Sequence, residues 1–155
     1  MTITDIIDAR CVLPSLKAQS KKQLLQELAH AAAQRVAIDH RVIFESLLRR
    51  EKLGSTGLGS GIAIPHSKIA GLAQVQGFFA RLAQPLDFDA IDGAPVDIVF
   101  MLLAPEHAGA DHLKALARIS RILRDAALVR KLRGTAEAQA LYAILTEPAA
   151  TASAA

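Results

Sequence analysis

The chain has 155 residues, of which 52% are hydrophobic, and its 18 Lys and Arg stand against 15 Asp and Glu, for a net charge of +3. That length fits one domain with a sizeable core, and the mixed charges, without a dense basic tract, argue against nucleic-acid binding. No apolar run approaches the ~20 residues of a membrane helix, and no signal-peptide pattern is present. With Cys11 as the one cysteine, we expect a cytoplasmic domain over residues 1–147 without membrane insertion, and a disordered, Ala-rich tail over 148–155.

The first part of the chain predicts a short strand and two helices. Residues 11–13 form the strand candidate. Ser20 and Gln23 have the spacing of a capping box, which predicts a helix start there and a helix that runs to about Arg35. Asp39 can cap a second helix, because its carboxylate can accept from the free N–H groups of the first turn. The apolar face of that second helix is predicted to hold Val42, Ile43, Phe44 and Leu47.

A glycine-rich stretch over residues 54–61 follows the second helix, whose last turn carries Arg50 near the negative end of the helix dipole. Glycines in this density cannot fill a core, so they are expected to shape the backbone. Residues 62–64 alternate as in a strand, and Pro65 predicts the end of that strand because it has no N–H to donate. His66 is then left at the mouth of the strand, beside a loop whose N–H groups can surround an anion.

The second half predicts the centre of the sheet and more helices. A strand is expected over residues 74–82, and the Asp92-Gly93 dipeptide predicts a turn. The apolar run over residues 96–103 predicts a central strand covered on both faces, which requires helices on two sides of the sheet. Three helices should follow, one opened near Asp111, one over 125–133, and a last one capped by Thr135. We therefore predict one α/β domain with three layers, α/β/α, and a mixed sheet of four or five strands.

His66 has the residue type and the position for several reactions. A neutral imidazole can attack phosphorus, bind a metal or take a proton, and His66 alone leaves all three open. Of the other histidines, His30 and His40 belong to predicted helix surfaces, whereas His107 and His112 flank the start of the helix that follows the long apolar strand. Such strand-to-helix junctions are where α/β sheets place their sites. His112 is therefore the predicted second histidine of the site.

The glycine loop and the histidines are also compatible in part with two other classes of site, a nucleotide site and a metal site. The loop lacks both nucleotide motifs, because Gly57–Gly61 precedes a strand instead of following one and Gly54–Gly59 is followed by Ser60 instead of Lys. A metal-dependent hydrolase is an alternative in which the ligands would be His66, His107, Asp111 and His112. It has no H-E-x-x-H motif or carboxylate cluster to support it.

The segment from Arg50 to His66 closely resembles the active-site signature of enzyme IIA domains of the phosphoenolpyruvate-dependent phosphotransferase system, of the mannitol/fructose type. Among these it is most similar to the stand-alone nitrogen-regulatory enzyme IIA. The resemblance extends roughly from Cys11 to Leu145, and it includes the stretches at residues 88–92, 95–97 and 111–113. It implies the same three-layer fold.

The resemblance also implies the roles of individual residues. His66 corresponds to the phosphorylated histidine, His112 to the second active-site histidine and Arg50 to the active-site arginine. A phosphate on His66 is further expected to contact the neighbouring loop residues Ser55, Thr56, Gly57 and Ser67. Ser67 stands where many relatives have Gly. Transfer between histidines requires no metal or other cofactor, so none is expected.

The partners implied by the resemblance are proteins. The donor would be an HPr-like phosphocarrier, and the regulated targets would be potassium-transport or sensor-kinase proteins. Because no transporter domain accompanies the sequence, regulation is favoured over the alternative of a component for sugar uptake. We expect the donor to dock on an apolar rim that includes Leu58, Ile69 and Phe79.

Overall fold

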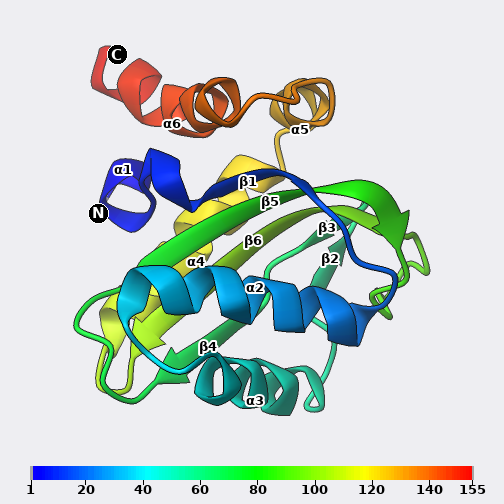
Figure 1. The fold of residues 1–155 in the computed structure, drawn as a ribbon. Coiled ribbons are helices and arrows are strands. Elements are labelled where there is room, and N and C mark those ends of the chain that lie inside the picture. Colours follow the sequence, from blue (N-terminus) through cyan, green and yellow to red (C-terminus); the bar gives the residue numbers. More distant parts are fainter. Residues whose placement is uncertain (1, 155) are drawn as a thin grey trace.

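The computed structural model describes residues 2–154, with side chains described to residue 147. Helices lie on both faces of a mixed sheet (Figure 1). Helices α2 and α3 pack against each other on one face, while α4, α5 and α6 cover the other and α1 packs against α4 and α6. The predicted three-layer α/β/α arrangement is therefore confirmed.

The helices and strands have the following bounds. The helices are α1 (Ile3–Ile6), the 3₁₀ turn η1 (Ala9–Cys11), α2 (Lys21–Val36), α3 (His40–Glu51), α4 (Ala110–Leu123), α5 (Ala126–Arg133) and α6 (Ala138–Ala154). The strands are β1 (Val12–Leu16), β2 (Gly57–Gly59), β3 (Ile62–Ala63), β4 (His66–Ile69), β5 (Gln76–Leu86) and β6 (Val96–Pro105). Within residues 2–154 none of these helices combines the length and the apolar character that a membrane crossing requires.

Strand β6 is the centre of the sheet. It pairs with β5 antiparallel on one side, and on the other side with β3 and then β4, both parallel. Strand β1 adds parallel to the outer edge of β5, and β2 adds antiparallel to β3. The described sheet has six strands, because the glycine loop pairs as β2 and the chain pairs again from His66 as β4.

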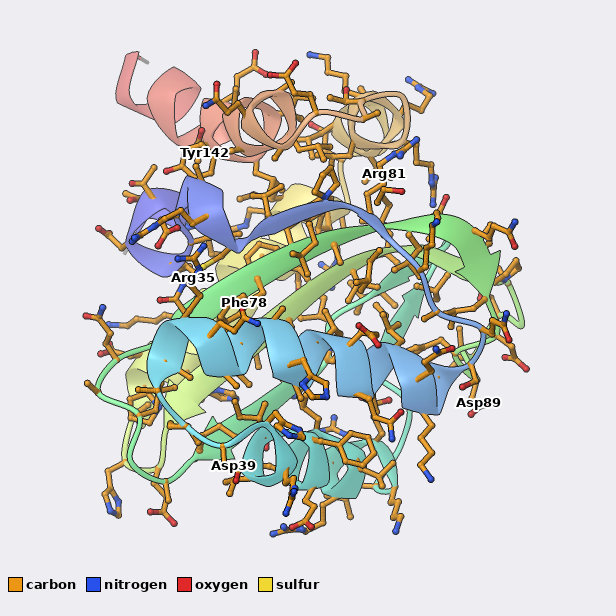
Figure 2. The ribbon with its side chains drawn as sticks, viewed as in Figure 1. Arg35, Asp39, Phe78, Arg81, Asp89 and Tyr142 are labelled. Atoms are coloured by element: carbon orange, nitrogen blue, oxygen red, sulfur yellow. The ribbon has the colours of Figure 1, made fainter. Side chains whose placement is uncertain are left out.

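The core explains why the apolar run at residues 96–103 is central. Residues 98–104 are fully buried with no alternation, as expected for a strand with helices on both faces. Phe78, which is labelled in Figure 2, and Phe79 of β5 point to opposite faces of the sheet, and both are also buried. Burying phenylalanine or leucine side chains stabilises the fold by about 1.5–3 kcal/mol each, so most of the fold's stability comes from this sheet and the helices on it.

The predicted helix starts are largely confirmed. The Ser20 hydroxyl accepts from the Gln23 N–H at 3.1 Å, although Gln23 Oε1 accepts from the N–H of Gln19 instead of that of Ser20. The Asp39 carboxylate caps α3 at 2.8 Å. The prediction that Val42 belongs to the buried face of α3 is wrong, since 47% of its surface is exposed.

Several predicted boundaries differ from the structure, among them that of β5, which covers Gln76–Leu86 instead of residues 74–82. Strand β1 continues through Pro14 to Leu16, which is allowed because β1 lies at the edge of the sheet and proline needs no ladder partner there. Thr135 does not cap the last helix. Its hydroxyl donates back to the Lys131 carbonyl at 2.6 Å, and α6 begins three residues later. The disordered tail predicted over 148–155 falls where side chains are not described, and it stays a prediction.

Candidate functional site

His66 lies where the edge of the sheet is interrupted between β3 and β4. Ile64 and Pro65 break the ladder, as the proline predicts, but the Pro65 carbonyl still accepts from the Leu102 N–H at 2.9 Å. The chain therefore stays against β6 and pairing resumes with His66 opposite Leu102. The expectation that the strand ends at Pro65 therefore holds for β3, although pairing with β6 resumes at His66. The backbone of His66 is paired with β6, and the residue lies next to the break in the sheet edge.

The tautomer of His66 is fixed by its own backbone neighbour. Its Nδ1 lies 2.8 Å from the Ile64 carbonyl oxygen, and because a carbonyl can only accept, Nδ1 carries the proton. In the neutral ring the lone pair is then on Nε2. Burial lowers the pKa of His66, the Arg50 charge lowers it further, and the bond to Ile64 opposes them. Neutral His66, with a nucleophilic Nε2, is therefore the prevailing form near pH 7.

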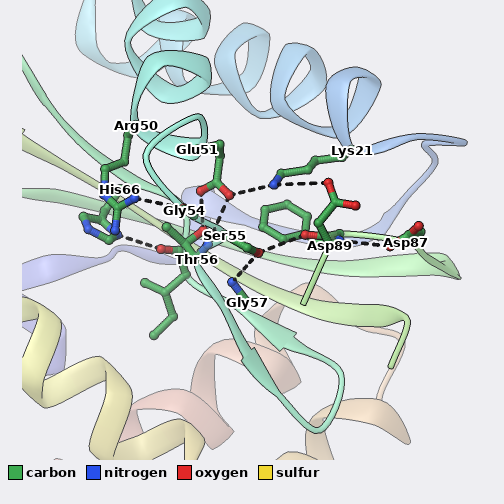
Figure 3. Close-up of polar contacts among 12 residues, drawn as sticks. Lys21, Arg50, Glu51, Gly54, Ser55, Thr56, Gly57, His66, Asp87 and Asp89 are labelled. Carbon is green, nitrogen blue, oxygen red and sulfur yellow. Dashed lines mark hydrogen bonds and ion pairs between the residues drawn. The ribbon is translucent and has the colours of Figure 1, made fainter. Parts of the chain in front are cut away.

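Arg50 reaches the site from the last turn of α3, as predicted. Its Nη1 donates to the Gly54 carbonyl at 3.0 Å, and Figure 3 shows the guanidinium beside the His66 ring. One turn earlier, the Ser46 hydroxyl pairs with that of Ser67 and donates to the Lys68 carbonyl at 3.2 Å. These hydrogen bonds link helix α3 directly to strand β4 and so fix the position of Arg50 relative to His66.

His112 reaches the site from the opposite layer, in the first turn of α4. Its ring centroid is 5.7 Å from that of His66, with the ring planes at 48°, and only 7% of the residue is exposed. Within the described part of the chain, its Nδ1 is buried without a hydrogen-bond partner. Burial lowers the pKa of His112, as do electrostatic interactions with the protonated form of His66 and with Lys68. The site therefore holds two neutral imidazoles and one guanidinium.

The ligand set of the metal-hydrolase alternative does not assemble. Across residues 2–154, no three His, Cys, Asp or Glu side chains come together as metal ligands would. His107 is exposed and lines a separate cavity of about 560 Å³ with Asp111, whereas neither His66 nor His112 lines that cavity. The structure brings His66 and His112 together and leaves His107 outside the site.

The loop residues expected near a phosphate already have partners in the structure. Ser55 Oγ donates to the Phe88 carbonyl at 2.9 Å and accepts from the Gly57 N–H at 3.1 Å. The Thr56 N–H and hydroxyl both donate to the Glu51 carboxylate, and the Ser67 hydroxyl pairs with Ser46 as described above. Their contact with phosphate stays a prediction, and what the structure shows is that they shape the loop.

Close packing explains one of the loop glycines. A Cβ on Gly57 would lie 2.9 Å from the Ala90 Cβ, closer than two carbon atoms can pack without displacement. The loop therefore lies directly against the segment that joins β5 and β6. Glycine is required here for this close approach of two backbones.

Glu51 is a site-proximal residue that the sequence reasoning missed. It ends α3 directly after Arg50, and its side chain is 3% exposed while bonded to Thr56 and to Lys21 Nζ at 3.0 Å (Figure 3). A signal was present: a carboxylate at the negative, C-terminal end of a helix is unfavourable on its own. Its position therefore implied a cationic partner elsewhere in the chain, which the structure identifies as Lys21.

The predicted apolar docking rim is mostly wrong. Leu58 is 47% exposed, but Ile69 and Phe79 are 1% and 0% exposed, since helices cover the sheet faces toward which they point. The strongly exposed large apolar side chains around the loop are instead Leu53 at 85% and Ile91 at 94%.

Known proteins match the chain over most of its length. Residues 5–147 match the family described as "Phosphoenolpyruvate-dependent sugar phosphotransferase system, EIIA 2". The chain is similar to a nitrogen regulatory protein of Bradyrhizobium diazoefficiens, with 57% identity over 98% of this chain and 99% of that protein. It is also similar to one from Pseudomonas aeruginosa, with 43% identity over 87% and 88%.

A solved structure supports the same relationship. The crystal structure of the nitrogen regulatory protein IIA-Ntr from Neisseria meningitidis superposes with a TM-score of 0.88 at 38% identity, covering 93% of this chain and 99% of that one. The similarity therefore extends over the whole fold, including the segments that carry His66, His112 and Arg50. The chain belongs to the EIIA type 2 family of the phosphoenolpyruvate-dependent phosphotransferase system.

Proposed function

We propose that this protein is a phosphohistidine-carrying regulator that accepts a phosphoryl group on His66 from an HPr-like carrier protein. The observation that carries the proposal is the fixed tautomer of His66, with Nδ1–H bonded to Ile64 and the Nε2 lone pair free. A nucleophilic imidazole needs this state to attack phosphorus. Membership of the phosphotransferase family supports the reaction class.

The proposed step exchanges one phosphorus–nitrogen bond for another. His66 Nε2 attacks the phosphorus of the carrier's protonated phosphohistidine in line, so the bond to the carrier's ring breaks and its electron pair leaves with a neutral imidazole. His66 becomes the phosphorylated, positively charged ring, whose Nδ1–H still donates to Ile64. Bonds and charges balance, and because the two phosphohistidines are chemically alike the exchange is nearly isoenergetic.

Arg50 and His112 are proposed to stabilise the transferring group. The Arg50 guanidinium lies beside His66 from one layer, and the His112 ring lies 5.7 Å away, centroid to centroid, from the other. Phosphoryl transfer depends mostly on positioning and on such charge stabilisation, and one preorganised donor is worth about 10² to 10³ in rate. We further propose that Ser55, Thr56, Gly57 and Ser67 form the wall of this phosphate site.

A regulatory role is proposed in preference to sugar uptake. The two sequence relatives described above are named nitrogen regulatory proteins, and each matches this chain over most of its own length. The phosphoryl group would bring roughly −1.5 to −2 charges to the edge of the sheet, offset in part by the positive charge of the His66 ring, and this change can switch the affinity of a partner protein. We propose that the protein acts in the cytoplasm on potassium-transport or sensor-kinase proteins, with the role of a sugar-transport component as the alternative.

The proposal is tested by the mass of the intact protein after incubation with phosphoenolpyruvate, enzyme I and an HPr-like carrier. We expect one added phosphate that is lost in acid and kept in base, as a phosphoramidate behaves. A parallel sample without the carrier should stay unmodified. If the wild-type chain stays unmodified while the carrier is shown to be phosphorylated, the proposed function is wrong.

The acceptance rate should persist to mildly acidic pH. Burial lowers the pKa of His66 below 6.5. The neutral, nucleophilic ring is therefore the major form at pH 6.5 and above, and the ring becomes mostly protonated only at a lower pH. Two-bond ¹H–¹⁵N spectra recorded across pH 5 to 8 should give a midpoint for His66 below about 6.5. A midpoint above that value would contradict the expected desolvation of the ring.

A further inference from the structure

Hydrogen bonds between the end of α3 and the glycine loop close residues 51–56 into a ring next to Arg50. The Glu51 carboxylate reaches forward to Thr56, accepting from its N–H at 3.1 Å and from its hydroxyl. Gly54 lies inside this ring, and its carbonyl accepts from Arg50 Nη1 at 3.0 Å. The position of the guanidinium therefore depends on where the ring holds the Gly54 carbonyl.

Packing does not hold the tip of this loop. Leu53 is 85% exposed, and a Cβ built on Gly54 would meet nothing within 4 Å. Gly54 also has φ of +148°, in the half of backbone space that glycine enters freely. With neither contacts nor a side chain to restrict it, the tip is fixed by backbone bonds back to α3 and by the Glu51–Thr56 closure.

Glu51 is itself held from a different element. Lys21 Nζ, in the first turn of α2, lies 3.0 Å from Glu51 Oε1 and 4.6 Å from the centroid of the Phe88 ring. The same ammonium is 3.7 Å from the Asp89 carboxylate, which is 74% exposed (Figure 3). Both charges are shielded from water, with side-chain exposures of 17% for Lys21 and 3% for Glu51, so each depends on the other for compensation.

We propose that Glu51 is a positioning residue for phosphoryl transfer. Paired with Lys21 and bonded to Thr56, it closes the loop that holds the Gly54 carbonyl and thereby orients the Arg50 guanidinium toward His66. Its effect on the transfer rate rests on the proposed function. Its effect on Arg50 does not, because that geometry is present in the unphosphorylated protein.

The test compares Thr56→Val with Thr56→Ser. Valine removes the hydroxyl bond to Glu51 at nearly constant volume, whereas serine keeps it. In single-turnover transfer from a phosphorylated HPr-like carrier, we expect Thr56→Val to be slowed about 10- to 100-fold, as for other small misplacements of a catalytic group. Asp89→Asn, which leaves the Glu51 contacts in place, should stay within about twofold of wild type. Thr56→Ser keeps the hydroxyl bond to Glu51, so it should be slowed less than Thr56→Val.

The Arg50 side-chain N–H signals, recorded by ¹H–¹⁵N NMR without any phosphate, separate positioning from direct phosphate contact by Thr56. If Glu51 positions Arg50, these signals shift or broaden in Thr56→Val and in Glu51→Gln but not in Thr56→Ser. If Thr56 acts only on the phosphate, the rate falls in Thr56→Val while the Arg50 signals stay unchanged, and the proposal is overturned. Circular dichroism would confirm that each variant is folded.

The same measurements distinguish failure of this proposal from failure of the proposed function. A wild-type chain that takes no phosphate, with Arg50 signals that still respond to the Glu51 and Thr56 substitutions, would refute the phosphoryl relay and leave the positioning of Arg50 supported. Unchanged Arg50 signals and unchanged transfer in folded Glu51→Gln and Thr56→Val proteins would refute the positioning role and leave the relay intact.

Discussion

Replacement of His66 with alanine is expected to reduce phosphate acceptance to less than about one part in 10³, because nothing replaces a lost nucleophile. His112 lies close by but is not expected to act instead, since the residue is buried in the first turn of α4 with 7% of its surface exposed. The measurement is the fraction of intact protein that gains phosphate from an HPr-like carrier, compared with wild type over the same time.

His107→Ala is the matched control for this substitution. His107 is exposed and lines a cavity that His66 does not share, so its loss should leave acceptance unchanged. The control also addresses the metal-hydrolase alternative, in which His107 would be a ligand. Phosphate on the His66→Ala protein would show that another residue is the acceptor, and equal losses in both variants would indicate a site that includes His107.

The sequence was sufficient for the layers of the fold because its strongest patterns are determined by burial. The apolar run at residues 96–103 has no polar alternation, so it had to lie between two layers of helices, and it does. Ser20 and Asp39 begin helices as predicted, since capping is a local interaction between residues two or three apart. The site histidines also follow from local position, one at a strand break and one in the first turn of a helix.

What the sequence could not provide was contact between distant segments. Glu51 and Lys21 are thirty positions apart in the printed sequence, and no periodicity relates them. The exposure of Val42 and the burial of Ile69 depend on which helix covers which face of the sheet, and hydrophobicity alone does not determine that. The hydroxyls of the loop looked available for phosphate because their partners, Phe88 and Glu51, become neighbours only after folding.

The strand count illustrates the same limit. A stretch with four glycines carries no strand propensity, yet residues 57–59 pair with β3 in the folded chain. Pairing there depends on the β5–β6 connection, whose Asp92 carboxylate accepts from the Ser60 N–H at 2.9 Å. The tertiary context thus makes the short strand β2 from a segment that the sequence presents as a loop.

Lys21→Met should destabilise the protein by about 3–5 kcal/mol, the cost of leaving a buried charge without its partner. The substitution keeps most of the apolar stem over Phe88 and removes the ammonium that lies 3.0 Å from the Glu51 carboxylate. Because Glu51 is only 3% exposed in its side chain, water cannot take over the role of the lysine. Urea unfolding followed by circular dichroism gives the change in the free energy of unfolding.

Lys131→Met is the matched control, since the ion pair between Lys131 and Glu147 spans 3.9 Å with both side chains about 60% exposed. Exposed pairs contribute about 0–1 kcal/mol, so this variant should differ little from wild type.

Adding Glu51→Gln to Lys21→Met should recover part of the loss, because the amide carries no charge and its oxygen can still accept from the Thr56 N–H. Equal small losses for Lys21→Met and Lys131→Met would mean that the Lys21–Glu51 pair behaves as a surface pair. Recovery in the double variant would instead show that the cost arises from the carboxylate beside Arg50, which links the stability of the fold to the geometry of the site.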